Sequence, residues 1–286
     1  MKQLFSTILV LAACFSFTLT SCERNADVDL PDVDSKLALS CFISPQDTII
    51  RAYVTRSIPV FELGSSNAQH QAVTNATVTL YDANGSVQLT FNPSLGLYET
   101  PATSFPIVAG QSYRITVALS GYPTLEASTS VPLSVPADFS ATADLIIDSV
   151  SFPGFPLIQA DIDHQFTDLS GDDNYYLINA VLNVNDTFNG ITQNYELARS
   201  IVSDNNSDGE LIRGSLRTSI NAQGSLSSLT LWLTSGTYDY YEFHRTILSG
   251  SNGGDPFSEP TLVYSNVTNG FGIFAGCNST SISIPL

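Results

Sequence analysis

The sequence predicts a mostly β protein, with an N-terminal β-sandwich followed by a second antiparallel β domain that carries one short helix. Two observations support this fold class. Apolar and polar residues alternate with a period of two in many short segments, as they do in strands with one buried face. The composition, 43% hydrophobic and 10% aromatic, is dominated by residues that suit half-buried pleated surfaces, and it excludes wholesale disorder.

The first residues have the layout of a bacterial lipoprotein signal. Lys2 gives a cationic start, an apolar run follows over residues 4–19, and small residues lead to Cys22. The apolar run is shorter than the roughly 20 residues of a comfortable transmembrane helix. We therefore expect residues 1–21 to be removed as a signal peptide and Cys22 to carry fatty acyl chains such as palmitate. Each buried methylene of these chains strengthens membrane attachment by about 0.8 kcal/mol. A plain secretory signal and a retained anchor are the alternatives.

The net charge of the chain limits the kinds of partner that it can bind. It has 10 Lys and Arg against 27 Asp and Glu, which gives a formal net charge of −17. Such a surface repels phosphate groups, so we expect neither nucleic-acid binding nor a polybasic membrane contact. Residues 22–35 are polar and acidic, and we expect them to form a tether between the lipid and the fold.

Residues 36–132 are expected to form the N-terminal β-sandwich, a fold of about 100 residues. Alternation predicts strands at 37–43, 50–54, 77–81, 87–91 and 113–119. Asn84-Gly85 follows the third of these segments, and this pair readily takes the positive φ angles of a tight hairpin turn.

Pro132 and Pro136 mark the expected domain boundary, because proline breaks strand ladders. Residues 137–286 would then form the second β domain, with strands at 161–166, 176–184 and 226–234. Helical spacing of apolar residues predicts one helix over about 239–248, and Ser249-Gly250 supplies a stop signal.

An oxygen-rich pattern suggests a calcium loop. Asp204, Asn206 and Asp208 alternate and are followed by Gly209, as in the first half of a calcium-binding loop. The bidentate glutamate expected six residues after the glycine is missing, since Ser215 occupies that position. The alternative is a polar turn between two strands, where Asn, Asp, Ser and Gly are common.

We expect the protein not to be an enzyme, because no zinc, phosphate-loop, nucleophile or dinucleotide motif appears. A glycan or peptide hydrolase would need two carboxylates facing each other across a cleft. One acidic stretch offers candidates, namely Asp161, Asp163, Asp168, Asp172 and Asp173. Asp161 and Asp163 are explained more simply as residues on the solvent-exposed face of a strand. His164, on the apolar face of that strand, is expected to be a packed histidine with a hydrogen-bond partner.

Two cysteines remain after Cys14 leaves with the signal and Cys22 is lipidated. Export to an oxidising compartment permits a disulfide between Cys41 and Cys277. The alternative is two separate buried thiols in different strands, which is how free cysteine commonly behaves.

Several blocks in sequence order carry a family resemblance. They are residues 73–82 (VTNATVTLYD), 96–98 (GLY), 109–113 (AGQSY), 240–243 (YYEF), 255–260 (DPFSEP) and 266–274 (NVTNGFGIF). Together they resemble the Bacteroidetes outer-membrane lipoproteins grouped as domain of unknown function 4249. The resemblance implies an immunoglobulin- or transthyretin-like N-terminal domain and genes that often neighbour TonB-dependent receptors. It implies no established activity, catalytic residue or ligand.

We therefore expect a non-catalytic lipoprotein on the bacterial outer membrane, acting as an accessory or ligand-capturing partner of a TonB-dependent transporter. Acidic residues after the lipidated cysteine, here Glu23, Asp27 and Asp29, resemble the signal that exports such lipoproteins to the cell surface, although Arg24 interrupts them. A periplasmic orientation is the alternative. A structural or adhesive surface protein and a hydrolase are the alternative functions.

Overall fold

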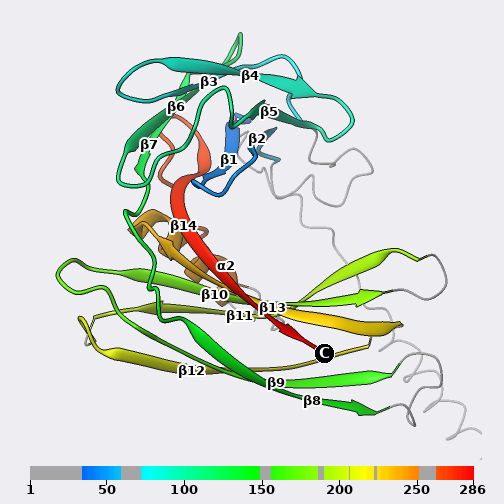
Figure 1. Ribbon diagram of the computed structural model, residues 1–286. Helices are drawn as coiled ribbons and strands as arrows, with labels where there is room; N and C mark the ends of the chain where they lie inside the picture. Colours follow the sequence, from blue (N-terminus) through cyan, green and yellow to red (C-terminus); the bar gives the residue numbers. More distant parts are fainter. Residues whose placement is uncertain are drawn as a thin grey trace, which may run out of the picture. The chain divides into compact units, whose positions relative to one another are not determined.

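Figure 1 shows the computed structural model of the chain, which describes residues 34–58, 72–148, 156–185, 190–205, 207–221, 224–250 and 262–286. Cys22 and most of the expected tether lie outside these ranges. Residues Ser35–Leu286 form one compact unit. The described part is mostly β with a single helix, which confirms the predicted fold class. The helix of this described part is not long and apolar enough to span a membrane.

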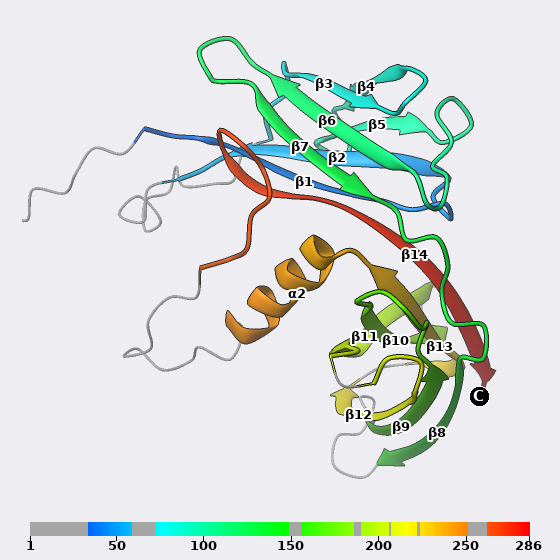
Figure 2. The same cartoon turned by 90° about the vertical axis from the view of Figure 1, so that its left-hand side faces the viewer.

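The N-terminal strands form a sandwich-like layer around one core. Their spatial order is β1-β2-β5-β4-β3-β6-β7. The bounds are β1 Leu37–Ile43, β2 Ile49–Arg56, β3 Thr77–Tyr81, β4 Ser86–Asn92, β5 Leu97–Pro101, β6 Ser112–Ala118 and β7 Leu125–Ser130. The sheet folds over on itself, so inward residues of β1 and β2 share a core with those of β3 and β6 (Figure 2). The strands predicted from alternation are confirmed, because the alternating apolar residues are the buried ones.

The β3–β4 hairpin lies where it is predicted, but its turn has a different structure. Tyr81 pairs with Ser86, so residues 82–85 form the loop. The Asp82 carboxylate accepts the N–H groups of Asn84 and Gly85, each at 2.7 Å. Gly85 is not among the glycines with positive φ. The expected positive-φ Asn-Gly turn is therefore wrong, because the side chain of Asp82 closes a longer loop.

The remaining strands enclose a second core between two sheets. One sheet has the order β12-β9-β8, and the other strands continue the larger sheet in the order β11-β10-β13-β14. The bounds are β8 Ser140–Asp148, β9 Leu157–Thr167, β10 Tyr175–Asn185, β11 Thr192–Ser203, β12 Leu211–Asn221, β13 Ser225–Gly236 and β14 Phe271–Pro285. Inward residues of β9, β10 and β13 meet in this core. Val131 belongs to the first core, and Val135 packs against the second.

Strand β14 belongs to both halves of the fold. Its first part, from Phe271 to Gly276, pairs in parallel with β1, and its second part pairs antiparallel with β13. The first part contacts β7 and the helix as well, so Ile273 to Gly276 are all buried. A strand covered on both faces has a continuous apolar run instead of alternation. Strand β14 therefore lies between β13 and β1 in the larger sheet and joins the two groups of strands.

Two glycines allow β14 to lie this close to its neighbours. A Cβ added at Gly272 would collide with the backbone of Leu39, and one at Gly276 would collide with the backbone of Ser130. Gly272 also has a φ of 113°, a conformation that L side chains rarely adopt. Across the same junction, the Gly276 N–H donates to Oγ1 of Thr129 at 2.9 Å. The close approach of β14 to β1 thus depends on Gly272, and its close approach to β7 depends on Gly276.

The helix α2, Tyr238–Gly250, confirms the helix predicted over 239–248. It contacts β14, β10, β11 and β13. Phe42 of β1 lies against its inner face, with ring centroids 5.6 Å from Tyr240, 5.8 Å from Phe243 and 5.6 Å from His244. Burial, followed by the positive charge of Arg199, lowers the pKa of His244 to about 4. The ring is therefore neutral at pH 7, as its aromatic surroundings require.

The close approach at Gly276 gives a stability prediction. Gly276→Ala should lower the free energy of unfolding by about 1–3 kcal/mol, because the new methyl group meets backbone that cannot move aside without strain. Chemical denaturation monitored by circular dichroism measures the change. Gly85→Ala is the matched control: nothing lies within 4 Å of the added Cβ. Equal effects of the two substitutions would contradict the proposed packing of β14.

Candidate functional site

Two loops meet at one end of the second β core because of strand register. Thr167 pairs with Leu211, which places the end of β9 beside the start of β12. Tyr175 pairs with Ser203, which places the start of β10 beside the end of β11. The β9–β10 loop and the β11–β12 loop therefore lie next to each other. Backbone hydrogen bonds join them, from Asp168 to Glu210 at 2.9 Å and from Asp204 to Asn174 at 3.2 Å.

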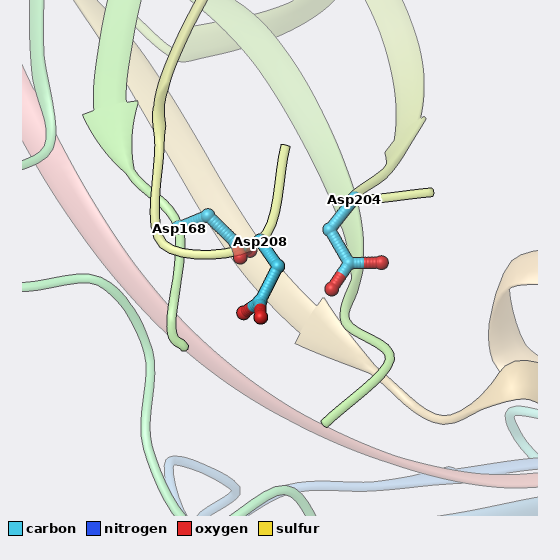
Figure 3. Close-up of side chains that lie close together, drawn as sticks. All are labelled: Asp168, Asp204 and Asp208. Atoms are coloured by element: carbon cyan, nitrogen blue, oxygen red, sulfur yellow. The ribbon is translucent and has the colours of Figure 1, made fainter. Parts of the chain in front are cut away.

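Three carboxylates converge where these loops meet (Figure 3). Asp168 comes from the β9–β10 loop, and Asp204 and Asp208 come from the β11–β12 loop. One oxygen of each lies within 4.8 Å of the others. Asp168 and Asp204 are 4% and 5% exposed, whereas Asp208 is exposed. Carboxylate oxygens that converge in this way are ligands of the kind that hard cations such as calcium prefer.

Each carboxylate also accepts a hydrogen bond from the facing loop or strand. Asp168 accepts the hydroxyl of Tyr176 at 2.7 Å and the N–H of Gly209 at 2.9 Å. Asp204 accepts the N–H of Asn174 at 2.9 Å, and Asp208 accepts the N–H of Gly171 at 2.8 Å. These bonds run between the two loops or down to β10. The three side chains therefore clamp the loops together.

The calcium-loop prediction finds two of its residues in this cluster. Asp204 and Asp208 converge, and Asn206 lies outside the described residues. The third member, Asp168, was assigned to the acidic stretch considered for hydrolysis. The sequence marks Asp168 as a candidate ligand only by its place directly after the end of a strand. The pairing of β9 with β12 brings it to the cluster.

A pocket of about 490 Å³ adjoins the clamped loops. It is lined from three segments, which lie within residues 130–134, 169–175 and 236–238. Tyr175 and Tyr238 give it aromatic surface, while Asp172 and Asp173 give it negative charge. Leu133, which is 77% exposed, stands at its edge. No Lys, Arg or His is among the described residues that line it.

The acidic residues considered for hydrolysis do not gather in one cleft. Asp161 and Asp163 lie exposed on the outer face of β9, as predicted for the wet side of a strand. Asp161 forms an ion pair with Arg217 at 3.0 Å. Asp168 lies in the loop cluster, and Asp172 and Asp173 line the pocket.

His164 is packed as predicted, at 4% exposure, and its Nδ1 has no hydrogen-bond partner among the described residues. Gly214 of β12 lies opposite, and its missing side chain leaves room for the imidazole ring. Gly214 therefore offers the ring space but no polar side chain. Burial lowers the pKa of His164, which keeps the ring neutral.

The two cysteines suggested as a disulfide are free in the structure, with Cys41 buried and Cys277 partly buried. Cys41 is in β1 and Cys277 is where β14 passes from β1 to β13. Burial raises the pKa of Cys277 to about 12 and raises that of Cys41 further. Both thiols are therefore protonated at pH 7 and are poor nucleophiles.

The fold and the loop cluster define a mostly β protein with an acidic, partly aromatic pocket. The chain belongs to the family described as a domain of unknown function (DUF4249), whose model matches residues 23–283. The match confirms the domain of unknown function that the sequence blocks resemble. No curated protein matches the chain.

The clamp gives a stability prediction. Asp168→Asn should lower the free energy of unfolding by about 1–3 kcal/mol, because its amide nitrogen faces a donor in a buried position. Thermal and urea denaturation measure the loss. Asp172→Asn, which changes an exposed carboxylate in the same loop, should stay within about 0.5 kcal/mol. A neutral effect of Asp168→Asn would contradict the clamp.

Proposed function

We propose that the protein is a non-catalytic lipoprotein of the bacterial outer membrane that acts as an accessory or ligand-capturing partner of a TonB-dependent transporter. The observation that carries this proposal is the lipoprotein signal ending at Cys22. The family match begins at residue 23, so the signal precedes the family domain directly. Acyl chains on Cys22 would hold the compact unit that begins at Ser35 beside the membrane.

The arrangement of the folded unit supports a binding role. The pocket beside the clamped loops is built from loops and a helix end next to the two β cores, which is how scaffolds commonly present binding residues. The aromatic residues at the pocket suit contacts with a ligand or partner, because they give large area with few torsions. The acidic tether provides reach between the lipid and this surface.

Calcium is a further part of the proposal, as a ligand of Asp168, Asp204 and Asp208. The convergence of these carboxylates from two loops favours it. Calcium takes six to eight oxygen ligands, and the carboxylates would supply the charged ones. A bound ion would also reduce the repulsion among three negative groups in a partly buried position.

The membrane attachment is tested by Cys22→Ser. The variant should accumulate as an uncleaved precursor that takes up no labelled fatty acid, since the thiol is the acylation site. Metabolic labelling and membrane fractionation measure this, with Cys41→Ser as the matched control because Cys41 is buried in the fold. Equal labelling of Cys22→Ser and the native chain would refute the lipoprotein assignment.

The partnership is tested by affinity purification from outer membranes solubilised in mild detergent. An outer-membrane receptor that depends on TonB should co-purify with the protein, and less of it with the Cys22→Ser variant. Purification of the protein alone would refute the partnership while leaving the membrane attachment intact.

Calcium binding predicts thermal stabilisation. At calcium concentrations about 100 times the dissociation constant, the melting temperature should rise by roughly 5 °C or more. Asp208→Ala should abolish the rise, whereas Asp144→Ala, an exposed carboxylate on β8, should preserve it. Differential scanning fluorimetry with EDTA as the reference makes the measurement. An unchanged melting temperature in the native chain would refute the calcium site.

A further inference from the structure

Two tyrosine rings form the aromatic side of the pocket beside the clamped loops. Tyr175 begins β10 and Tyr238 begins α2, and their ring centroids are 5.6 Å apart. Tyr238 is 52% exposed, so its ring is available to a ligand. Tyr241 lies 5.1 Å from Tyr175 and supports that ring from the helix. Both tyrosines lie at the ends of regular elements, and their rings contact each other. A ligand would therefore lose little affinity to restricting the motion of these side chains.

The pocket carries negative charge that is not compensated. Asp172 and Asp173 line it and are exposed, and neither takes part in an ion pair found among the described residues. Asp204 of the adjoining cluster adds to this charge. Burial, followed by the negative charges of Asp173 and Asp204, raises the pKa of Tyr175. The field at the aromatic wall therefore favours a positive group.

Asn174 positions the acidic part of the wall. Its side-chain nitrogen donates to the carbonyl oxygens of Leu169 and of Asp172, the latter at 2.6 Å. Its backbone N–H donates to Asp204. The loop that carries Asp172 and Asp173 is therefore held from within and from the facing loop. The carboxylates are presented on a fixed backbone.

We propose that this pocket binds an organic cation, with its ammonium or guanidinium group against Tyr175 and Tyr238 and with Asp172 and Asp173 as counter-charges. Aromatic faces attract such cations through the ring quadrupole, and the attraction grows as water is excluded. A volume of about 490 Å³ admits a small organic molecule or one long basic side chain. This inference deepens the proposed ligand-capturing function and rests on it.

The cation has two possible sources, and two pairs of probes distinguish them. Choline represents a free quaternary amine, and dimethylbutanol is its uncharged carbon analogue. Nα-acetyl-arginine amide represents a basic side chain of a partner protein, and Nα-acetyl-citrulline amide is its uncharged analogue. Isothermal titration calorimetry on the purified full chain, in EDTA and at low salt, measures binding of all four. At least one cation should bind, should bind at least tenfold more tightly than its neutral analogue, and should weaken as salt is added.

Variants connect that binding to the pocket. Tyr238→Ala should weaken binding of the cation roughly tenfold, and Tyr238→Phe should retain it, because the ring provides the attraction. Asp173→Asn should also weaken it roughly tenfold. Tyr53→Ala, which removes an exposed ring from β2, and Asp144→Asn, which removes an exposed charge from β8, are the controls and should bind normally. Circular dichroism checks that each variant is folded.

Each outcome of these experiments either supports or refutes cation binding by the pocket. Binding of choline alone assigns the site to small amines, and binding of Nα-acetyl-arginine amide assigns it to a basic side chain. Failure of both cations to bind, equal binding of the neutral analogues, or undiminished binding by Tyr238→Ala and Asp173→Asn would overturn it. Failure of receptor co-purification with intact cation binding would refute the transporter partnership alone.

Discussion

The pairing of β14 with both β1 and β13 is the constraint on which the rest of the structure depends. The two cores are separate sets of apolar residues, and β14 is the strand that runs from one sheet into the other. Its burial on both faces requires glycine where backbones approach, at Gly272 and Gly276. Polar contacts secure the same junction, since the side-chain nitrogen of Asn278 donates to the carbonyl oxygen of Pro132 and its oxygen accepts a hydrogen bond from Gln46.

The candidate site follows from this arrangement. Residues 130–134 leave the sandwich beside β14, and α2 begins where β13 ends, so both segments reach the loops at the end of the second core. Strand register then brings Asp168 to Asp204 and Asp208. The hydrogen bonds of these carboxylates fix the loops that form one wall of the pocket. The clamped loop between β9 and β10 also carries Asp172 and Asp173, which give the pocket its negative charge.

Local patterns in the sequence predicted much of the fold but little of the site. Alternation located β1, β3 and β6, and helical spacing located α2, because burial of one face imposes a period that a single segment displays. The parallel pairing of β1 with β14 joins residues more than 200 positions apart, and no local pattern encodes it. Asp168 was missed as a partner of Asp204 for the same reason. The turn after β3 was wrongly predicted as a tight Asn-Gly turn, because the side chain of Asp82 closes a longer loop.

Hydrogen exchange under native conditions tests most directly whether β14 joins the two cores into one folding unit. Protected amides of β1 in the sandwich and of β10 in the second core would be followed in increasing denaturant. A shared strand predicts that both sets reach the same opening free energy and exchange in one cooperative event. Separate opening free energies, with β10 still protected after β1 has opened, would show that β14 does not couple the cores and would contradict the account.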